Sequence, residues 1–214
     1  MPSQDSESKQ VANYFETHAA DFASIYEEQE EGTVRQWRDK LSRGTVIQRL
    51  DLVKAMAAKD KPARVLDVGC GAGRFSVPLA ALGSDVTGID FAPEMIAMAD
   101  AAAAKAGVGD KTTFLATDYL TWDAPEQFDL TLACGVLDYV SDPLPLMKKM
   151  TKDTRGQLVL SFPKKFHALV PLRKVRLTME GCPVFFYTKA QVQALADEFM
   201  ADFQISPLGR DYML

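Results

Sequence analysis

Three glycines at every second position, Gly69, Gly71 and Gly73, follow the apolar run of residues 65–68. A helical pattern begins directly after them, at Phe75. Alternating glycines let the backbone adopt conformations closed to other residues, and they let a ligand approach the main chain closely. The first turn of the following helix adds unpaired N–H groups. The stretch therefore predicts a strand, a tight turn and a helix start that together bind a ligand rich in hydrogen-bond acceptors.

The spacing of the glycines separates two classes of ligand. A dinucleotide-binding turn reads G-x-G-x-x-G/A, with a third small residue that allows close packing beside a pyrophosphate. Here that third position is Arg74, because the third glycine stands one place earlier. With Asp67 just before the turn, the stretch resembles the cofactor loop of the class I S-adenosylmethionine (AdoMet)-dependent methyltransferases. The resemblance implies that Asp67 faces the ammonium group of AdoMet. It also implies that the loop follows the homocysteine part, with contacts from Gly69, Cys70, Gly71 and Gly73.

Two further acidic residues stand at the ends of predicted strands. Residues 85–90 read as a strand that ends in Asp90, about twenty residues after the turn, where an acidic side chain accepts both ribose hydroxyls. A strand at 112–116 is followed by Asp118, which matches the residue that accepts from the adenine amino group in the resembled family. A single aspartate after a strand is more typical of a turn or a helix cap, but three in register indicate AdoMet. The predicted cofactor contacts are completed by Phe91, Met95, Tyr119, Cys134 and Arg49.

The elements around the turn alternate between strands and helices. Such alternation predicts an α/β fold with a doubly wound, mainly parallel sheet, here of seven strands. We expect an AdoMet-binding domain over residues 61–214, with a substrate-side insertion at about 163–187. The remaining predicted strands are 128–133, 157–162, 203–206 and 210–214, and the helices are 93–106, 144–150 and 189–199.

Residues 1–60 are expected to form N-terminal lid helices. Tyr14 and Ile25 belong to an apolar, aromatic pattern at helical spacing. The triplet at 42–44 indicates a break before a second apolar stripe. The segment is loosely similar to the lid helices of small-molecule O-methyltransferases of the ubiquinone-precursor and magnesium-protoporphyrin types. That similarity implies that the helices cover the cofactor and that Arg49 meets its carboxylate.

Methyl transfer from AdoMet needs few catalytic groups. It is an in-line displacement, which an enzyme can promote by orientation, and a base is needed only when the nucleophile must lose a proton. Residues 137–143 resemble the Leu-Glu-His-Val-x-Asp-Pro stretch of small-molecule methyltransferases, but Asp138 and Tyr139 replace the Glu-His pair. The candidate catalytic residues are Asp138, Tyr139, His18 and His167. A salt-bridged carboxylate and packed histidines are the structural alternatives.

The charge distribution indicates what kind of molecule accepts the methyl group. The formal charge of −5 argues against a general affinity for nucleic acid. Residues 148–176 are nonetheless strongly basic, so we expect an anionic or aromatic small molecule, with Arg173 and Arg176 as anion contacts. Tyr14 and Tyr187 could add an aromatic wall that also favours the sulfonium. The alternative is an ordinary solvated surface and an ordinary core.

Composition sets the remaining limits. The 214 residues, 47% of them hydrophobic, fit one domain of ordinary size. No apolar run nears the ~18 residues that could span a bilayer and no signal pattern opens the chain, so a cytoplasmic protein is expected. Three widely separated cysteines support neither a disulfide framework nor a metal site.

Three alternatives to O-methylation remain open. The first is methylation of nitrogen or carbon on a small molecule. The second is an NAD(P)-dependent oxidoreductase, against which Arg74 counts. The third is a protein that binds AdoMet without turnover, because the three aspartates indicate binding but not catalysis.

Overall fold

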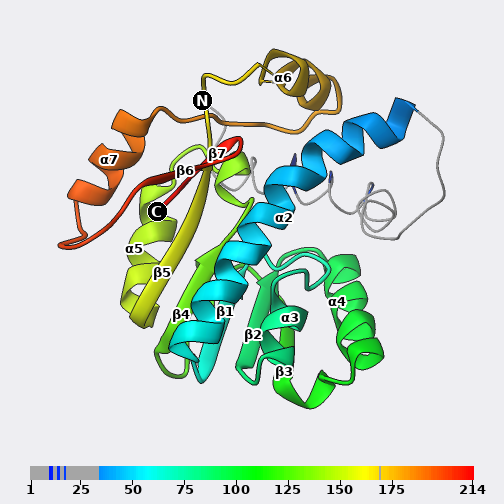
Figure 1. Ribbon diagram of the computed structural model, residues 1–214, viewed down its shortest axis with the longest axis vertical. Helices are drawn as coiled ribbons and strands as arrows, with labels where there is room; N and C mark the ends of the chain where they lie inside the picture. The colour runs from blue at the N-terminus through cyan, green and yellow to red at the C-terminus, as the bar shows by residue number, and fades with distance from the viewer. Residues whose placement is uncertain (1–9, 12–13, 15–16, 18–33, 169) are drawn as a thin grey trace.

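A seven-stranded sheet forms the centre of the molecule (Figure 1). The computed structural model describes residues 10, 11, 14, 17, 34–168 and 170–214. Its strands are β1 (Arg64–Val68), β2 (Asp85–Asp90), β3 (Thr112–Ala116), β4 (Phe128–Ala133), β5 (Thr154–Pro163), β6 (Ser206–Leu208) and β7 (Asp211–Met213).

The strand order is β3-β2-β1-β4-β5-β7-β6. The strands from β3 to β5 in this order are parallel, whereas β7 pairs antiparallel with both β5 and β6. The predicted seven-stranded, mainly parallel sheet is therefore confirmed. Because the strands from β1 to β5 are parallel, the loops that follow them all leave from one edge of the sheet.

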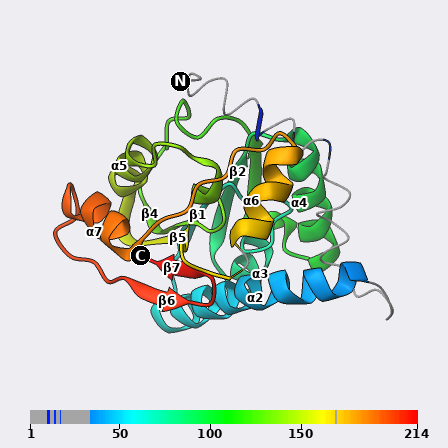
Figure 2. The ribbon, with the colours of Figure 1, turned by 90° about the horizontal axis from the view of Figure 1, so that it is seen from above.

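Helices cover both faces of this sheet. They are α2 (Val34–Asp60), α3 (Ser76–Ala81), α4 (Pro93–Ala106), α5 (Leu144–Asp153), α6 (Val170–Met179) and α7 (Lys189–Asp197), with short 3₁₀ turns η1 (Gly109–Lys111) and η2 (Leu137–Tyr139). Figure 2 looks onto the edge from which the loops leave, and α6 lies on that side. Among the described helices, none combines the length and apolar character needed to cross a membrane.

Successive residues of β1 serve two separate cores. Val65 packs with Val53 of α2 and Leu79 of α3 on one face. Leu66 packs on the other face in the cluster that contains Met147 of α5. Strands of a parallel sheet are buried on both sides and so read as nearly continuous apolar runs. This explains why β1 and β2 lie where the sequence pattern predicted them.

The predicted break at residues 42–44 is wrong. The helix α2 runs without interruption through Gly44. Gly44 is exposed, and a Cβ added there would meet no described atom within 4 Å. A glycine in a helix interior costs only about 1 kcal/mol. Burial of Val53 and Ala57 further along α2 fixes the helix against the sheet, so packing overrides the local signal.

The segment 163–187 contains a helix that the sequence pattern did not predict, α6. It extends from the carboxyl end of β5, over the edge where the loops gather (Figure 1). The next helix, α7, starts as predicted at Thr188. The Thr188 hydroxyl accepts from the Gln191 N–H while the Gln191 side chain accepts from the Thr188 N–H, a capping box.

Candidate functional site

The glycine turn is laid against the end of β2. The N–H groups of Gly69 and Cys70 both donate to the carbonyl of Ile89, at 2.7 and 3.0 Å. All three glycines have positive φ, at 68° for Gly69, 52° for Gly71 and 77° for Gly73. Residues other than glycine rarely adopt this backbone conformation, so the turn depends on the three glycines.

The space around Gly69 differs from the space around Gly71. A Cβ at Gly69 would lie 2.3 Å from the side chain of Val136, which follows β4, so any other residue would force that side chain to move. A Cβ at Gly71 would meet no described atom within 4 Å. The main chain at Gly71 is thus held in a left-handed conformation beside open space, and a ligand can lie directly against it.

Asp90 ties this turn to β2. Its Oδ2 accepts from the Gly71 N–H at 3.0 Å, and its Oδ1 accepts from the Ala92 N–H at 3.0 Å. Burial raises the pKa of Asp90, and the two N–H donors oppose that shift. Each carboxylate oxygen has two lone pairs, so both oxygens keep acceptor capacity for a pair of ribose hydroxyls.

Asp67 is buried beneath the same turn. Its Oδ2 accepts from the Ser76 hydroxyl at 2.6 Å, and Ser76 is a residue that the sequence reasoning missed. Burial raises the pKa of Asp67 to about 7, and the negative charge of Asp90 adds to this, while the Ser76 hydroxyl opposes it. An ammonium group placed here would favour the ionised carboxylate.

The raised pKa of Asp67 makes AdoMet binding depend on pH. Because the ammonium pairs with the carboxylate form, affinity should fall roughly tenfold per pH unit below about 7, and calorimetry should detect proton release. The stability of the free protein should change with pH in the opposite direction. The pKa of Asp67 is raised in the folded state, so the stability that Asp67 contributes should be complete below its unfolded pKa and lost as pH rises through about 7. In Asp67→Asn the affinity should be weak and flat with pH; an unaltered pH profile would remove this assignment.

Residues predicted to lie around adenine come from two loops. Asp118 is exposed, and its Oδ1 accepts from the Leu120 N–H at 2.9 Å. Phe91 is exposed, and Met95 is buried in a small cluster that includes Ala72 of the glycine turn. The packing of Met95 against that turn is compatible with an adenine contact, which stays a prediction for Asp118 and Met95, as does the cofactor contact of Phe91.

Several other predicted cofactor residues turn inward. The Tyr119 hydroxyl donates to Asp153 Oδ2 at 2.7 Å in the core, so we leave Tyr119 out of the proposed site. The Cys70 side chain packs towards Gly88, leaving only its main chain to a ligand. Burial raises the pKa of the Cys134 thiol to about 12, so this group is un-ionised and acts by packing.

Arg49 of α2 is engaged in a buried ion pair. Its Nε and Nη2 donate to Asp211 Oδ2 at 2.7 and 2.5 Å. Burial lowers the pKa of Arg49, but the Asp211 carboxylate outweighs this and keeps the guanidinium charged. Its Nη1 lies 3.1 Å from where a Cβ of Gly135 would be, just after β4. The guanidinium therefore reaches the edge of the sheet, where the predicted contact with a cofactor carboxylate remains to be tested.

On the other side of this edge, η2 carries Asp138 and Tyr139. Asp138 is buried, and its Oδ2 accepts from Arg173 Nη2 at 2.5 Å. The same nitrogen donates to the Tyr139 hydroxyl at 3.4 Å. Asp138 Oδ1 is buried and has no hydrogen-bond partner among the residues that the structure describes. Buried polar atoms are rarely left unpaired, so this oxygen is a candidate acceptor for a ligand hydroxyl.

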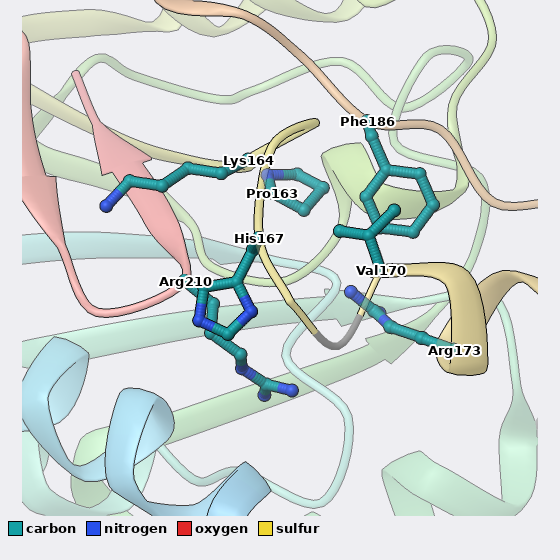
Figure 3. Close-up of a pocket in the computed structure, with 7 residues that line it drawn as sticks. All are labelled: Pro163, Lys164, His167, Val170, Arg173, Phe186 and Arg210. Atoms are coloured by element: carbon teal, nitrogen blue, oxygen red, sulfur yellow. The ribbon is translucent and has the colours of Figure 1, made fainter.

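Beside Asp138 the surface is hollowed, and basic side chains line the hollow (Figure 3). Among them Lys164 extends away from the others, and its Nζ donates to Gly209 O at 2.7 Å. Burial and the nearby charge of Arg173 lower the pKa of Arg210. Such crowding of cations favours an anion. The hollow is lined by Pro163, Lys164, His167, Val170, Arg173, Phe186 and Arg210.

The remaining residues that were predicted to contact the methyl acceptor do not lie together. The Tyr187 hydroxyl donates to Val140 O at 3.0 Å, and its ring packs edge-on against Phe162, so it supports η2 from the core. The Tyr14 hydroxyl donates to Glu180 at 3.1 Å, and the charge of Arg176 lies near Tyr14 rather than at the hollow. His18 lies outside the described residues.

The hollow also contains residues that the sequence reasoning did not single out. Lys164 directly follows β5. Its place in the basic segment 148–176 was the one feature of the sequence that could have pointed to it. Arg210 stands beside it because β7 pairs with β5, and nothing local in the sequence indicates that pairing.

The comparisons with known proteins agree with this geometry. Residues 65–155 match the family described as "Methyltransferase domain". The ubiquinone biosynthesis O-methyltransferase of Xanthomonas campestris pv. campestris (strain B100) is 38% identical over 100 residues, covering 47% of this chain and 41% of that protein. The protein of the same name from Azorhizobium caulinodans is 43% identical over 82 residues, covering 38% and 32%. The chain thus matches well under half of the length of these curated relatives.

A solved structure extends the agreement to nearly the whole fold. Magnesium protoporphyrin IX methyltransferase from Synechocystis PCC 6803, crystallised with bound SAH, superposes with a TM-score of 0.75 and 23% sequence identity, covering 95% of this chain and 94% of that one. The fold, the glycine turn with its aspartates, and the matched domain point to one family. Residues 65–155 of the chain thus match a methyltransferase domain, and the chain has the fold of an S-adenosylmethionine-dependent methyltransferase.

Proposed function

We propose that the protein transfers the methyl group of AdoMet to an oxygen nucleophile on a small molecule. The cofactor side carries this proposal. Asp90 holds the main chain of Gly71 open to a ligand, with Asp67 buried beneath the same turn. The relatives add support for oxygen as the nucleophile, because their printed names describe O-methyltransferases.

The acceptor in this proposal carries an anionic group that binds in the hollow. Three cations, Lys164, Arg173 and Arg210, line it, and Arg173 forms an ion pair with Asp138. The remaining wall is apolar and includes Phe186, whose ring lies 5.8 Å from the Arg173 guanidinium carbon. A flat body against this wall would place its anionic group among the cations.

Asp138 has the geometry to orient the nucleophile. Arg173 fixes one carboxylate oxygen, which leaves Oδ1 to accept from the hydroxyl of the acceptor. With a phenol or alcohol this contact would position the attacking oxygen and receive its proton during transfer. AdoMet held at the glycine turn by Asp67 and Asp90 would supply the methyl group, and S-adenosylhomocysteine would be the leaving product.

The competing functions differ in what they bind and consume. Methylation of nitrogen or carbon would use the same cofactor site with another acceptor. A non-catalytic protein would bind AdoMet without producing S-adenosylhomocysteine (AdoHcy). An oxidoreductase would bind a nicotinamide dinucleotide instead.

Calorimetry combined with a turnover assay tests the proposal. We expect AdoMet and AdoHcy to bind, NAD(H) not to bind, and labelled methyl groups to appear on hydroxylated aromatic acids from a panel of acceptors. The panel should include matched amines and the corresponding neutral amides. Binding of NAD(H) alone, or transfer only to amines, would overturn the proposal.

Removing cations from the hollow should weaken acceptor binding selectively. We expect Lys164→Gln combined with Arg210→Gln to raise KM for an acidic acceptor about a hundredfold or more, since each charge-assisted hydrogen bond contributes about 1.5–3 kcal/mol. AdoMet affinity should not change. We choose these positions over Arg173 because its loss would strand the buried carboxylate of Asp138. The matched control is Lys152→Gln at the end of α5, and equal losses for acidic and neutral acceptors would contradict the anion site.

A further inference from the structure

One face of α6 exposes large apolar side chains. Leu172, Val175 and Met179 are 70%, 59% and 83% exposed, and Phe166, in the turn before the helix, is 81% exposed. Residues three, four and seven apart lie on the same side of a helix, so the three helical residues form one stripe. Scattered exposed apolar residues are ordinary, but four of this size within fourteen positions require an explanation.

The stripe is held outward by contacts on the other sides of the helix. Leu177 is buried in a cluster with Tyr14 and Cys182. Arg173 is fixed to Asp138 through its guanidinium. Because α6 is anchored by these two residues, turning the stripe inward would break the ion pair and expose Leu177.

The charge around the stripe is opposite in sign to that of the whole protein. The chain has a formal charge of −5, yet residues 163–179 contain no Asp or Glu. Lys165 and Lys174 are exposed, and Arg176 is half-buried beside the stripe. The segment also contains Lys164 and Arg173, which line the hollow. An anionic partner is therefore attracted to this segment more than to the remainder of the surface.

The combination of a convex apolar stripe and neighbouring cations fits a lipid surface. Phosphate backbones of nucleic acids would use the cations but leave the apolar side chains in water. In contrast, an amphipathic helix can bury bulky apolar side chains among acyl chains while Lys and Arg reach the headgroups. In Figure 1, α6 lies at the outer rim of the molecule, above the edge of the sheet. A flat bilayer could approach it there.

We infer that α6 and the turn before it bind the surface of an anionic lipid bilayer. Leu172, Val175, Met179 and Phe166 enter the interface, and Lys165 and Lys174 contact the headgroups. The inference does not depend on the methylated acceptor. It also places the hollow, whose residues Arg173 and Val170 belong to the same helix, next to the membrane.

Flotation with lipid vesicles tests the inference. The full chain should bind vesicles of phosphatidylcholine mixed with phosphatidylglycerol, and should bind vesicles of phosphatidylcholine alone at least about tenfold more weakly. Raising the salt concentration should reduce binding, because it screens the attraction between Lys or Arg and the headgroups. Leu172→Gln combined with Met179→Gln should lower binding about tenfold or more, since the apolar contribution is lost.

Matched control variants distinguish a specific role of the stripe from a general effect of losing exposed apolar or basic side chains. Leu82→Gln combined with Leu120→Gln removes two apolar side chains that are 47% and 43% exposed elsewhere, and should leave vesicle binding unchanged. Lys165→Gln with Lys174→Gln should weaken binding, whereas Lys54→Gln with Lys59→Gln on α2 should not. AdoHcy binding in every variant reports an intact fold and an intact cofactor site.

Three results would overturn the inference. The first is equal binding to neutral and anionic vesicles, and the second is equal losses in the stripe and control variants. The third is absence of vesicle binding; a concentration-dependent dimer that Leu172→Gln and Met179→Gln abolish would then assign the stripe to a second copy of the chain.

Discussion

Replacing Asp90 with alanine should weaken AdoHcy binding about a hundredfold or more. The carboxylate is expected to accept from both ribose hydroxyls, and two charge-assisted hydrogen bonds of ~1.5–3 kcal/mol each amount to roughly two to four powers of ten in affinity. The variant also loses the bonds from Gly71 and Ala92 that shape the turn. Calorimetry with AdoHcy measures the effect, and a thermal melt in parallel measures the stability cost.

A shorter ligand separates the two ends of the cofactor site. 5′-Methylthioadenosine keeps the ribose and adenine of AdoHcy but lacks the amino-acid part. Asp90→Ala should therefore weaken both ligands, whereas Asp67→Asn should weaken AdoHcy alone. Asp118→Ala removes one exposed acceptor and should cost about tenfold for both. If AdoHcy affinity were unchanged in Asp90→Ala, the ribose assignment would fail.

Arg49→Met should destabilise the fold by about 3–5 kcal/mol. The variant leaves the carboxylate of Asp211 buried without its cation, and breaking a buried ion pair from one side costs this much. Asp211 lies in β7 beside β5, so the effect reaches the edge of the sheet that holds the hollow. Urea unfolding measures the free-energy difference.

The double variant Arg49→Met with Asp211→Leu gives the matched control. It removes both charges and should recover most of the lost stability, since a buried pair can be replaced by apolar groups at little cost. The refolded double variant then isolates the predicted cofactor role of Arg49. AdoHcy should bind it roughly tenfold more weakly, and 5′-methylthioadenosine should bind it unchanged. Equal affinities for AdoHcy in the double variant and the parent would remove Arg49 from the cofactor site.

Local sequence determined the parts of this protein whose causes are local. The buried parallel strands are continuous apolar runs, so their bounds followed from the pattern, as for Asp85–Asp90. The turn at 69–73 needs positive φ, which glycine supplies, and the start of α7 needs the Thr188 capping box. The positions of Asp67, Asp90 and Asp118 at the ends of strands could be predicted because each lies within a few residues of its strand end.

Contacts between distant segments were decided only in the tertiary structure. Arg49 and Asp211 are 162 positions apart, and Asp138 and Arg173 are 35 apart, so no periodicity links them. Lys164 and Arg210 share the hollow because β7 returns antiparallel to β5. Tyr119 and Tyr187 follow the predicted loops in sequence but are drawn into the core, where burial of a large ring outweighs its exposure at a site. The sequence thus determined the cofactor turn, whose geometry is local, whereas the acceptor side depends on which distant charges the packing of the sheet brings together.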